Sequence, residues 1–188
     1  MADAHQSTAA VCRCGQTAIE LAGAPIESVV CHCESCRTAA RGFERDLARA
    51  IAYIKRYHAT AALIILDVDR LKPINDSFGH AAGDAVLKAI AAVLSGKIRS
   101  SDAIARLGGD EFAILLWNLT ETDARAKADL MEQEIDSLTF TFRGRTVSAG
   151  ASAGIAMLDA HAEVGRALEA ADSAMYLRKA QRRHEGAA

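Results

Sequence analysis

Cysteine is absent from most of the chain. All five cysteines occur at or before Cys36, and the rest of the 188 residues contain none. Proline is also scarce, with two residues. A disulfide framework is therefore excluded for the larger part of the chain. This uneven distribution divides the sequence into a cysteine-rich leader, residues 1–41, and a main domain, residues 42–188.

Long hydrophobic runs, a basic excess and a targeting signal are also missing. No stretch approaches the ~18 uninterrupted apolar residues of a membrane-spanning helix, so we expect no membrane partner. The net charge of −2 argues against nucleic acid as a partner, because neutralising phosphates requires an excess of basic residues. The first ten residues lack the basic end and apolar stretch of a secretion signal. We therefore expect a cytoplasmic protein.

The main domain alternates between helical and strand patterns. Phe43, Leu47 and Ile51 recur at helical spacing. The isoleucine-rich run over 61–66 predicts a buried strand with Asp67 and Asp69 at its C-terminal end. The elements predicted after this strand are a polar loop, a helix over 81–94, a hairpin around 108–111, a helix over 121–135, strands near 140–142 and 147–157, and a helix over 164–182. This order predicts an α+β fold, a palm-like (ferredoxin-like βαββαβ) antiparallel sheet flanked by helices.

Two stretches carry a resemblance to a known family. The string RLGGDEF, residues 106–112, follows DVDRLKPINDSFGHAAGDAVL, residues 67–87, and both resemble the GGDEF family of diguanylate cyclases, over about residues 41–183. The resemblance implies a bacterial signalling enzyme that condenses two GTP molecules into cyclic di-GMP and two pyrophosphates. Because each palm holds one GTP, it also implies a catalytic homodimer.

Carboxylates occur at the strand end and at the hairpin tip, where they could hold metal. Joining nucleotides builds charge on the attacking and leaving oxygens, which two Mg²⁺ or Mn²⁺ ions per site commonly stabilise. By resemblance Asp67, the Val68 carbonyl and Asp110 coordinate metal. Asp110 also activates the 3′-hydroxyl, Glu111 supports metal binding, and Lys72 stabilises charge on the reacting phosphates. The alternative is that these turn acids are merely solvated.

The nucleotide itself has candidate contacts on both sides of the hairpin. Gly108 and Gly109 lack a Cβ, so their backbone can take φ > 0 and lie close to a triphosphate. By resemblance the guanine edge is read by Asn75 and Asp84, the ring packs near Leu71 and Leu87, and the distal phosphates meet Lys179 and Arg183. Two departures from the family stand out: Leu71 replaces its usual phenylalanine, and RRH, residues 182–184, replaces its Gly-Arg-Asn ending.

A second nucleotide site is predicted just before the hairpin. Arg99 and Asp102 form an RxxD string five residues upstream of the Gly-Gly pair, where the family has a product-inhibition motif. Arginine can grip a phosphate or a guanine edge, and aspartate can accept from guanine N1 and N2. Cyclic di-GMP is therefore an expected feedback ligand.

Clustered cysteines in the leader favour a zinc site over disulfides in a cytoplasmic chain. The stretch over 11–37 is similar to the start of the glutathione-linked formaldehyde-activating zinc family, but the later Cys-x-x-Cys pair and the β domain are missing, so we expect no such activity. The alternative is five reduced thiols in an unstructured tail. The candidate ligands are Cys12, Cys14, Cys31, Cys33 and Cys36.

Two other functions stay open beside the enzyme. One is a non-catalytic module that binds GTP or cyclic di-GMP and carries a zinc- or redox-sensing leader. The other is a zinc-responsive switch whose output is catalysis. Retention of the metal acids and the Gly-Gly pair favours the active enzyme.

Overall fold

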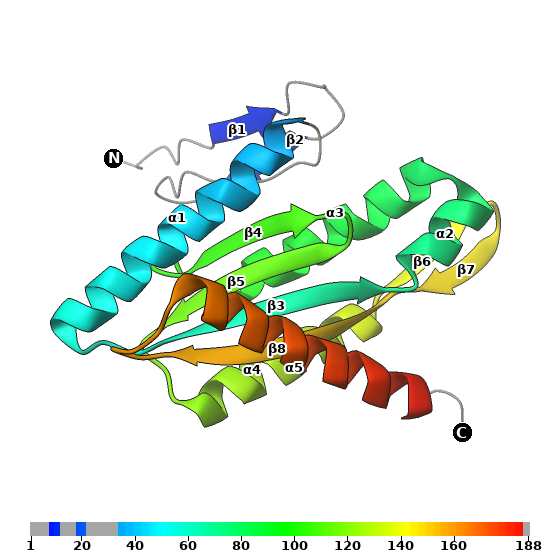
Figure 1. Ribbon diagram of the computed structural model, residues 1–188. Coiled ribbons are helices and arrows are strands. Elements are labelled where there is room, and N and C mark those ends of the chain that lie inside the picture. Colours follow the sequence, from blue (N-terminus) through cyan, green and yellow to red (C-terminus); the bar gives the residue numbers. More distant parts are fainter. Residues whose placement is uncertain (1–7, 12–17, 22–33, 186–188) are drawn as a thin grey trace, which may run out of the picture.

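The computed structural model describes residues 8–11, 18–21 and 34–185, with side chains over 41–184. Figure 1 shows a central sheet with helices on both faces. The elements are β1 Thr8–Val11, β2 Ala18–Leu21, α1 Glu34–Tyr57, β3 Ala61–Asp69, α2 Leu71–Phe78, α3 His80–Lys97, β4 Ala103–Gly108, β5 Glu111–Trp117, α4 Glu121–Asp136, β6 Thr139–Phe142, β7 Arg145–Ser148, β8 Gly150–Leu158 and α5 Val164–Glu185.

The central sheet has four antiparallel strands in the order β4-β5-β3-β8. Strand β3 lies inside the sheet, and both of its faces are covered, which explains its nearly continuous apolar sequence. Together with the helices between the strands, this order confirms the α+β, ferredoxin-like palm. The register places Asp67 opposite Glu111 on β5 and opposite Ser152 on β8.

Two hydrophobic cores lie on opposite faces of the sheet. On one face, Leu63 and Ile65 of β3 pack with α1 and α5. On the other face, Ile64 and Leu66 pack with α2, α3 and α4. Side chains alternate across a strand, so a single apolar run serves both cores. The helical stripe expected over Phe43, Leu47 and Ile51 is confirmed, since all three side chains are buried on α1.

The predicted polar loop after β3 is wrong, because residues 71–78 form helix α2. Its polar residues and Pro73 resemble a loop in sequence. Pro73 nevertheless lies in the first turn of α2, where a missing N–H costs no helical hydrogen bond. Gly79, at φ +86°, then separates α2 from α3. The strand expected over 147–157 also differs: it is divided between β7 and β8 at Ala149.

The predicted boundary between leader and main domain falls inside helix α1, which begins at Glu34. Of the candidate zinc ligands, Cys12, Cys14, Cys31 and Cys33 lie outside the described residues. Cys36 belongs to the backbone of α1, but its side chain also lies outside them. Over the described ranges, each helix is too short or too polar to cross a membrane.

Candidate nucleotide site

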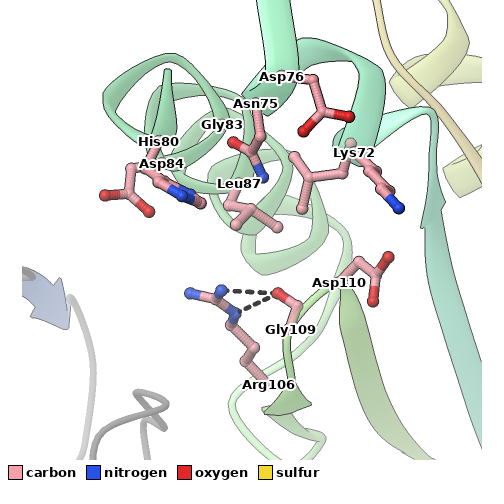
Figure 2. Close-up of a pocket in the computed structure, with 11 residues that line it drawn as sticks. Lys72, Asn75, Asp76, His80, Gly83, Asp84, Leu87, Arg106, Gly109 and Asp110 are labelled. Atoms are coloured by element: carbon pink, nitrogen blue, oxygen red, sulfur yellow. Dashed lines mark hydrogen bonds between the residues drawn. The ribbon is translucent and has the colours of Figure 1, made fainter.

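A pocket of about 480 Å³ opens where α2, the start of α3 and the β4–β5 turn meet. Figure 2 shows Asn75 and Asp84 on the helical side of the pocket and Arg106, Gly109 and Asp110 on the hairpin side. The predicted site residues that line this pocket are Leu71, Lys72, Asn75, Asp84, Leu87, Gly109 and Asp110. The structure thus brings the expected guanine readers and the hairpin acid to one cavity.

The hairpin tip is held beside β3 by hydrogen bonds. The Val68 N–H donates to the Asp110 carbonyl at 2.9 Å, and Arg106 donates to the Gly109 carbonyl from Nε at 3.1 Å and from Nη2 at 2.6 Å. Gly109 has φ +46°, as expected. The same expectation is wrong for Gly108, which ends β4 without a positive φ and does not line the pocket. The turn therefore needs one left-handed residue rather than two.

Burial and like charge destabilise the ionised carboxylates around the tip. Burial raises the pKa of Asp67; Lys179 lowers it, Asp110 and Asp69 raise it further, and the net value lies above the ordinary 3.8. Burial also raises the pKa of Glu111 above its ordinary 4.5, and the charges of Asp67 and Asp110 add to this increase. A divalent cation with carboxylate ligands would relieve this repulsion, so the donor set suits Mg²⁺ or Mn²⁺.

A lysine offsets the negative charge of the carboxylates at the end of β3. Lys179 Nζ on α5 contacts the Asp67 carboxylate and lies 3.7 Å from Asp69 Oδ1. Within the part of the chain that the structure describes, no three carboxylate, imidazole or thiol groups converge as a ready metal site. Lys179 therefore lies against the predicted metal ligand, and Arg183, on the same helix, is exposed. Their assignment to distal phosphates stays a prediction.

Asn75 has an unsatisfied buried acceptor beside the pocket. Its Oδ1 accepts no hydrogen bond from any described group. A Cβ added at Gly83 would lie 2.0 Å from that oxygen, so only glycine lets α3 approach Asn75 this closely. A half-turn of the amide would exchange Oδ1 and Nδ2, presenting the acceptor to a guanine N–H in the pocket. The arrangement therefore fits the expected reading of guanine.

The predicted feedback residues lie apart from this pocket, in the turn between α3 and β4. Arg99 is exposed, but Asp102 is 2% exposed. Asp102 accepts from the backbone N–H of Arg99 at 2.9 Å and of Trp117 at 3.1 Å. The structure thus gives Asp102 a turn-stabilising role that the motif alone did not indicate. Binding of cyclic di-GMP by this pair stays a prediction.

Four pocket-lining residues were absent from the predicted site: Asp76, His80, Gly83 and Arg106. Arg106 begins the RLGGDEF string, and Gly83 precedes the predicted guanine reader Asp84, so both had a sequence signal in their neighbours. The Arg106 contact is local, because its acceptor is the carbonyl of Gly109, three residues further along the same hairpin. The Gly83 contact with the Asn75 amide depends on how α2 and α3 pack.

Comparison with known proteins agrees with this site. Residues 39–185 match the family described as "Diguanylate cyclase, GGDEF domain". Residues 7–53 match the family described as "Glutathione-dependent formaldehyde-activating enzyme", which is similarity over a minor part of the chain, and the two matches overlap in α1.

Curated relatives and solved structures point the same way. The chain is 43% identical over 143 residues to the diguanylate cyclase TpbB of Pseudomonas aeruginosa, covering 75% of this chain and 33% of the relative. It is 39% identical over 138 residues to the probable diguanylate cyclase DgcE of Escherichia coli, covering 73% of this chain and 12% of the relative. The chain thus spans a third or less of these relatives.

Among solved structures, the GGDEF domain of TpbB superposes with a TM-score of 0.69 at 42% identity, covering 75% of this chain and 89% of that one. The GGDEF domain of DgcB from Caulobacter crescentus, solved with c-di-GMP, gives a TM-score of 0.72 at 27% identity, covering 76% and 85%. With the family match over residues 39–185 and the pocket that the GGDEF hairpin helps to build, the chain belongs to the diguanylate cyclase GGDEF-domain family.

Proposed function

We propose that the chain condenses two GTP molecules into cyclic di-GMP and two pyrophosphates. The observation that carries this proposal is the pocket that Asn75, Asp84 and the hairpin acid Asp110 line together. A guanine reader and a reacting-centre carboxylate in one cavity are what transfer of a guanylyl group requires. The names of the TpbB and DgcE relatives support the same chemistry.

Recognition of GTP would begin on α2 and α3. Asn75 and Asp84 supply acceptors for the N1–H and N2–H edge of guanine, and Leu71 and Leu87 provide apolar surface beside the ring. Leu71 and Leu87 are buried, at 7% and 5% exposure, so this surface is preformed rather than assembled on binding.

The reaction joins O3′ of one nucleotide to the α-phosphorus of the other while the bond to pyrophosphate breaks. Asp110 would take the proton of the attacking 3′-hydroxyl, and Lys72, in the same pocket, would neutralise charge on the phosphates. When bound, two Mg²⁺ or Mn²⁺ ions would supply Lewis-acid stabilisation of the attacking and leaving oxygens. Asp67, the Val68 carbonyl, Asp110 and Glu111 are the groups that would hold them.

A second candidate function is a non-catalytic module that binds GTP or cyclic di-GMP. Lys179 favours this alternative, because its ammonium lies against Asp67, a predicted metal ligand. The two functions share the guanine-binding pocket and differ in turnover.

Incubation of the full chain with GTP and Mg²⁺, followed by chromatography, separates the two candidates. We expect cyclic di-GMP from the native chain and a loss of at least ~10²-fold in Asp110→Asn, which keeps the shape but removes the base. Asp129→Asn is a matched control, since Asp129 is exposed on α4. Binding of GTP without any product would contradict the cyclase and support the binding module.

A further inference from the structure

Helix α5 is tied to the rest of the molecule by a buried carboxylate. The Glu132 side chain on α4 is 3% exposed. Its Oε1 accepts from the Ala153 N–H at 2.8 Å, and its Oε2 accepts from Arg178 Nε at 3.0 Å and Nη2 at 2.7 Å. Ala153 belongs to β8, an edge strand, so Glu132 satisfies a backbone donor at the sheet edge while it pairs with α5.

A second arginine, one turn further along α5, joins the same carboxylate to two aspartates. Arg182 Nη2 donates to Asp136 at 2.6 and 2.7 Å, and its Nη1 lies 3.4 Å from Glu132 Oε2. Arg182 Nε lies 3.7 Å from Asp69 Oδ2. We call Asp69, Glu132, Asp136, Arg178 and Arg182 the α5 clamp.

Lys179 lies between the two clamp arginines in sequence and contacts the clamp in space. Its ammonium touches Asp67 and lies 3.7 Å from Asp69 Oδ1. Asp69 is itself oriented by Ser152, whose Oγ donates to Oδ2 at 2.9 Å. The backbone of α5 is thus fixed on both sides of Lys179, and one of the carboxylates that the ammonium meets is fixed as well.

The clamp includes Arg182, a position at which this chain differs from the family pattern. Arg182 belongs to the RRH ending that replaces Gly-Arg-Asn. Glycine at this position has no side chain to pair with Asp69, Glu132 or Asp136. A shift of α5 would separate these ion pairs and leave an uncompensated buried charge. The clamp therefore favours one position of α5.

We propose that the α5 clamp positions Lys179 at the carboxylate edge of the nucleotide site, where the ammonium meets the triphosphate of GTP. This inference rests on the proposed function and on the phosphate contact that the family resemblance implies for Lys179; the clamp adds the means by which Lys179 is positioned. Glu132 and Arg182 act through Lys179 and are positioning residues. The effect of the clamp on nucleotide affinity should therefore depend on the number of phosphates. Loss of the clamp should weaken binding of the distal phosphates and leave guanine binding unaffected.

The test compares GTP and GMP affinities by calorimetry in Mg²⁺, for Glu132→Gln and Arg182→Gln. Two controls match them. Glu134→Gln changes the same helix at a carboxylate that pairs with Lys97, and Arg166→Gln changes α5 at an arginine that pairs with Glu163. We expect both clamp variants to bind GTP about tenfold more weakly, with GMP changed less than about twofold, and both controls to bind as the native chain does.

A double-mutant cycle with Lys179→Ala isolates the positioning role. Lys179→Ala alone should weaken GTP binding and leave GMP binding unchanged. Adding Arg182→Gln to this variant should then have no further effect on GTP affinity. Equal losses for GTP and GMP, an additive cycle, or unchanged GTP affinity would overturn the inference. If Glu132→Gln does not fold by circular dichroism, Arg182→Gln, at a side chain 21% exposed, decides the outcome. Absence of cyclic di-GMP synthesis would refute the proposed cyclase, while these affinities would still decide the positioning role.

Discussion

Gly83 lies on α3 directly against the Asn75 side chain, and its missing Cβ has a functional consequence. A methyl group there would meet Asn75 Oδ1 at 2.0 Å and Cγ at 2.9 Å. Gly83→Ala therefore has to displace the Asn75 amide from the pocket wall. We expect GTP affinity to fall about tenfold, the loss of one or two hydrogen bonds, and discrimination against ATP to fall with it. Calorimetry with both nucleotides measures this.

Gly96 provides the matched control on the same helix. A Cβ at Gly96 meets no atom within 4 Å. Gly96→Ala should leave GTP affinity unchanged and raise the free energy of unfolding by up to about 1 kcal/mol, because alanine is the better helix former. Equal GTP affinity in both alanine variants would contradict the role given to the Gly83–Asn75 contact.

Glu111 makes stability depend on pH. Its pKa is raised above the ordinary 4.5 by burial and by the charges of Asp67 and Asp110. The folded chain thus binds this proton more tightly than the unfolded chain, so stability falls as pH rises from 4.5 through the raised value. At about pH 7.5, Glu111→Gln should unfold at a higher midpoint urea concentration than the native chain. The difference between the two midpoints should shrink near pH 4.

The control for the pH effect is Glu44→Gln, at an exposed glutamate on α1. It should leave the urea midpoint unchanged at both pH values. A Glu111→Gln variant that is less stable than the native chain above neutral pH would show that an attraction, rather than repulsion, dominates at the hairpin tip.

At the scale of single residues, most of the pocket was predicted through the resemblance to the GGDEF family, whose two motif stretches contain the residues that line it. Asn75 and Asp84 lie on consecutive helices, and Asp110 follows Gly109 in the turn. Contacts between distant segments had no such signal. The pairing of Lys179 with Asp67 spans 112 positions and the pairing of Arg182 with Asp136 spans 46, and neither is encoded in local spacing.

At the scale of elements, β8 and α5 approach closely because Gly154 has no side chain. A Cβ at Gly154 would lie 2.0 Å from Met175 N and 2.1 Å from Ala171 O, both backbone atoms of α5. The backbone of a helix cannot yield as a side chain can. We expect Gly154→Ala to lower the free energy of unfolding by about 3 kcal/mol or more, as measured by urea titration.

Gly165, in the first turn of the same helix, tests whether this loss comes from close approach. A Cβ there meets nothing within 4 Å, so Gly165→Ala should not destabilise the fold. If Gly154→Ala unfolds at the same urea concentration as the native chain, helix α5 does not pack against β8 as closely as described.

Elements with an apolar periodicity were predicted well, and elements with mixed signals were not. Strand β3 and helix α3 follow from continuous or striped apolar residues that the cores require. Helix α2 was missed because its apolar positions are few: Leu71 and Ile74 are its buried residues. Tertiary packing against the second core, rather than propensity, makes this segment helical.

At the scale of the whole molecule, the proposed synthesis of cyclic di-GMP would require more than one chain. The described pocket has one pair of predicted guanine readers and one hairpin acid, whereas cyclic di-GMP contains two guanosines joined symmetrically. Two-fold apposition of identical chains would supply the second half-site. Specific activity should therefore rise with protein concentration and level off once dimers saturate. Activity per chain that stays constant in samples that sediment as monomers would refute this.

Helix α1 has a geometric consequence for everything that precedes it. Its 24 residues run without interruption from Glu34 to Tyr57, about 36 Å at 1.5 Å per residue. Each residue also turns the chain by about 100°. Inserting one residue into α1 would therefore rotate its first turn about the helix axis by that angle while leaving the sheet unchanged. The number of residues in this helix therefore sets the angular position of Glu34 about the helix axis relative to the palm.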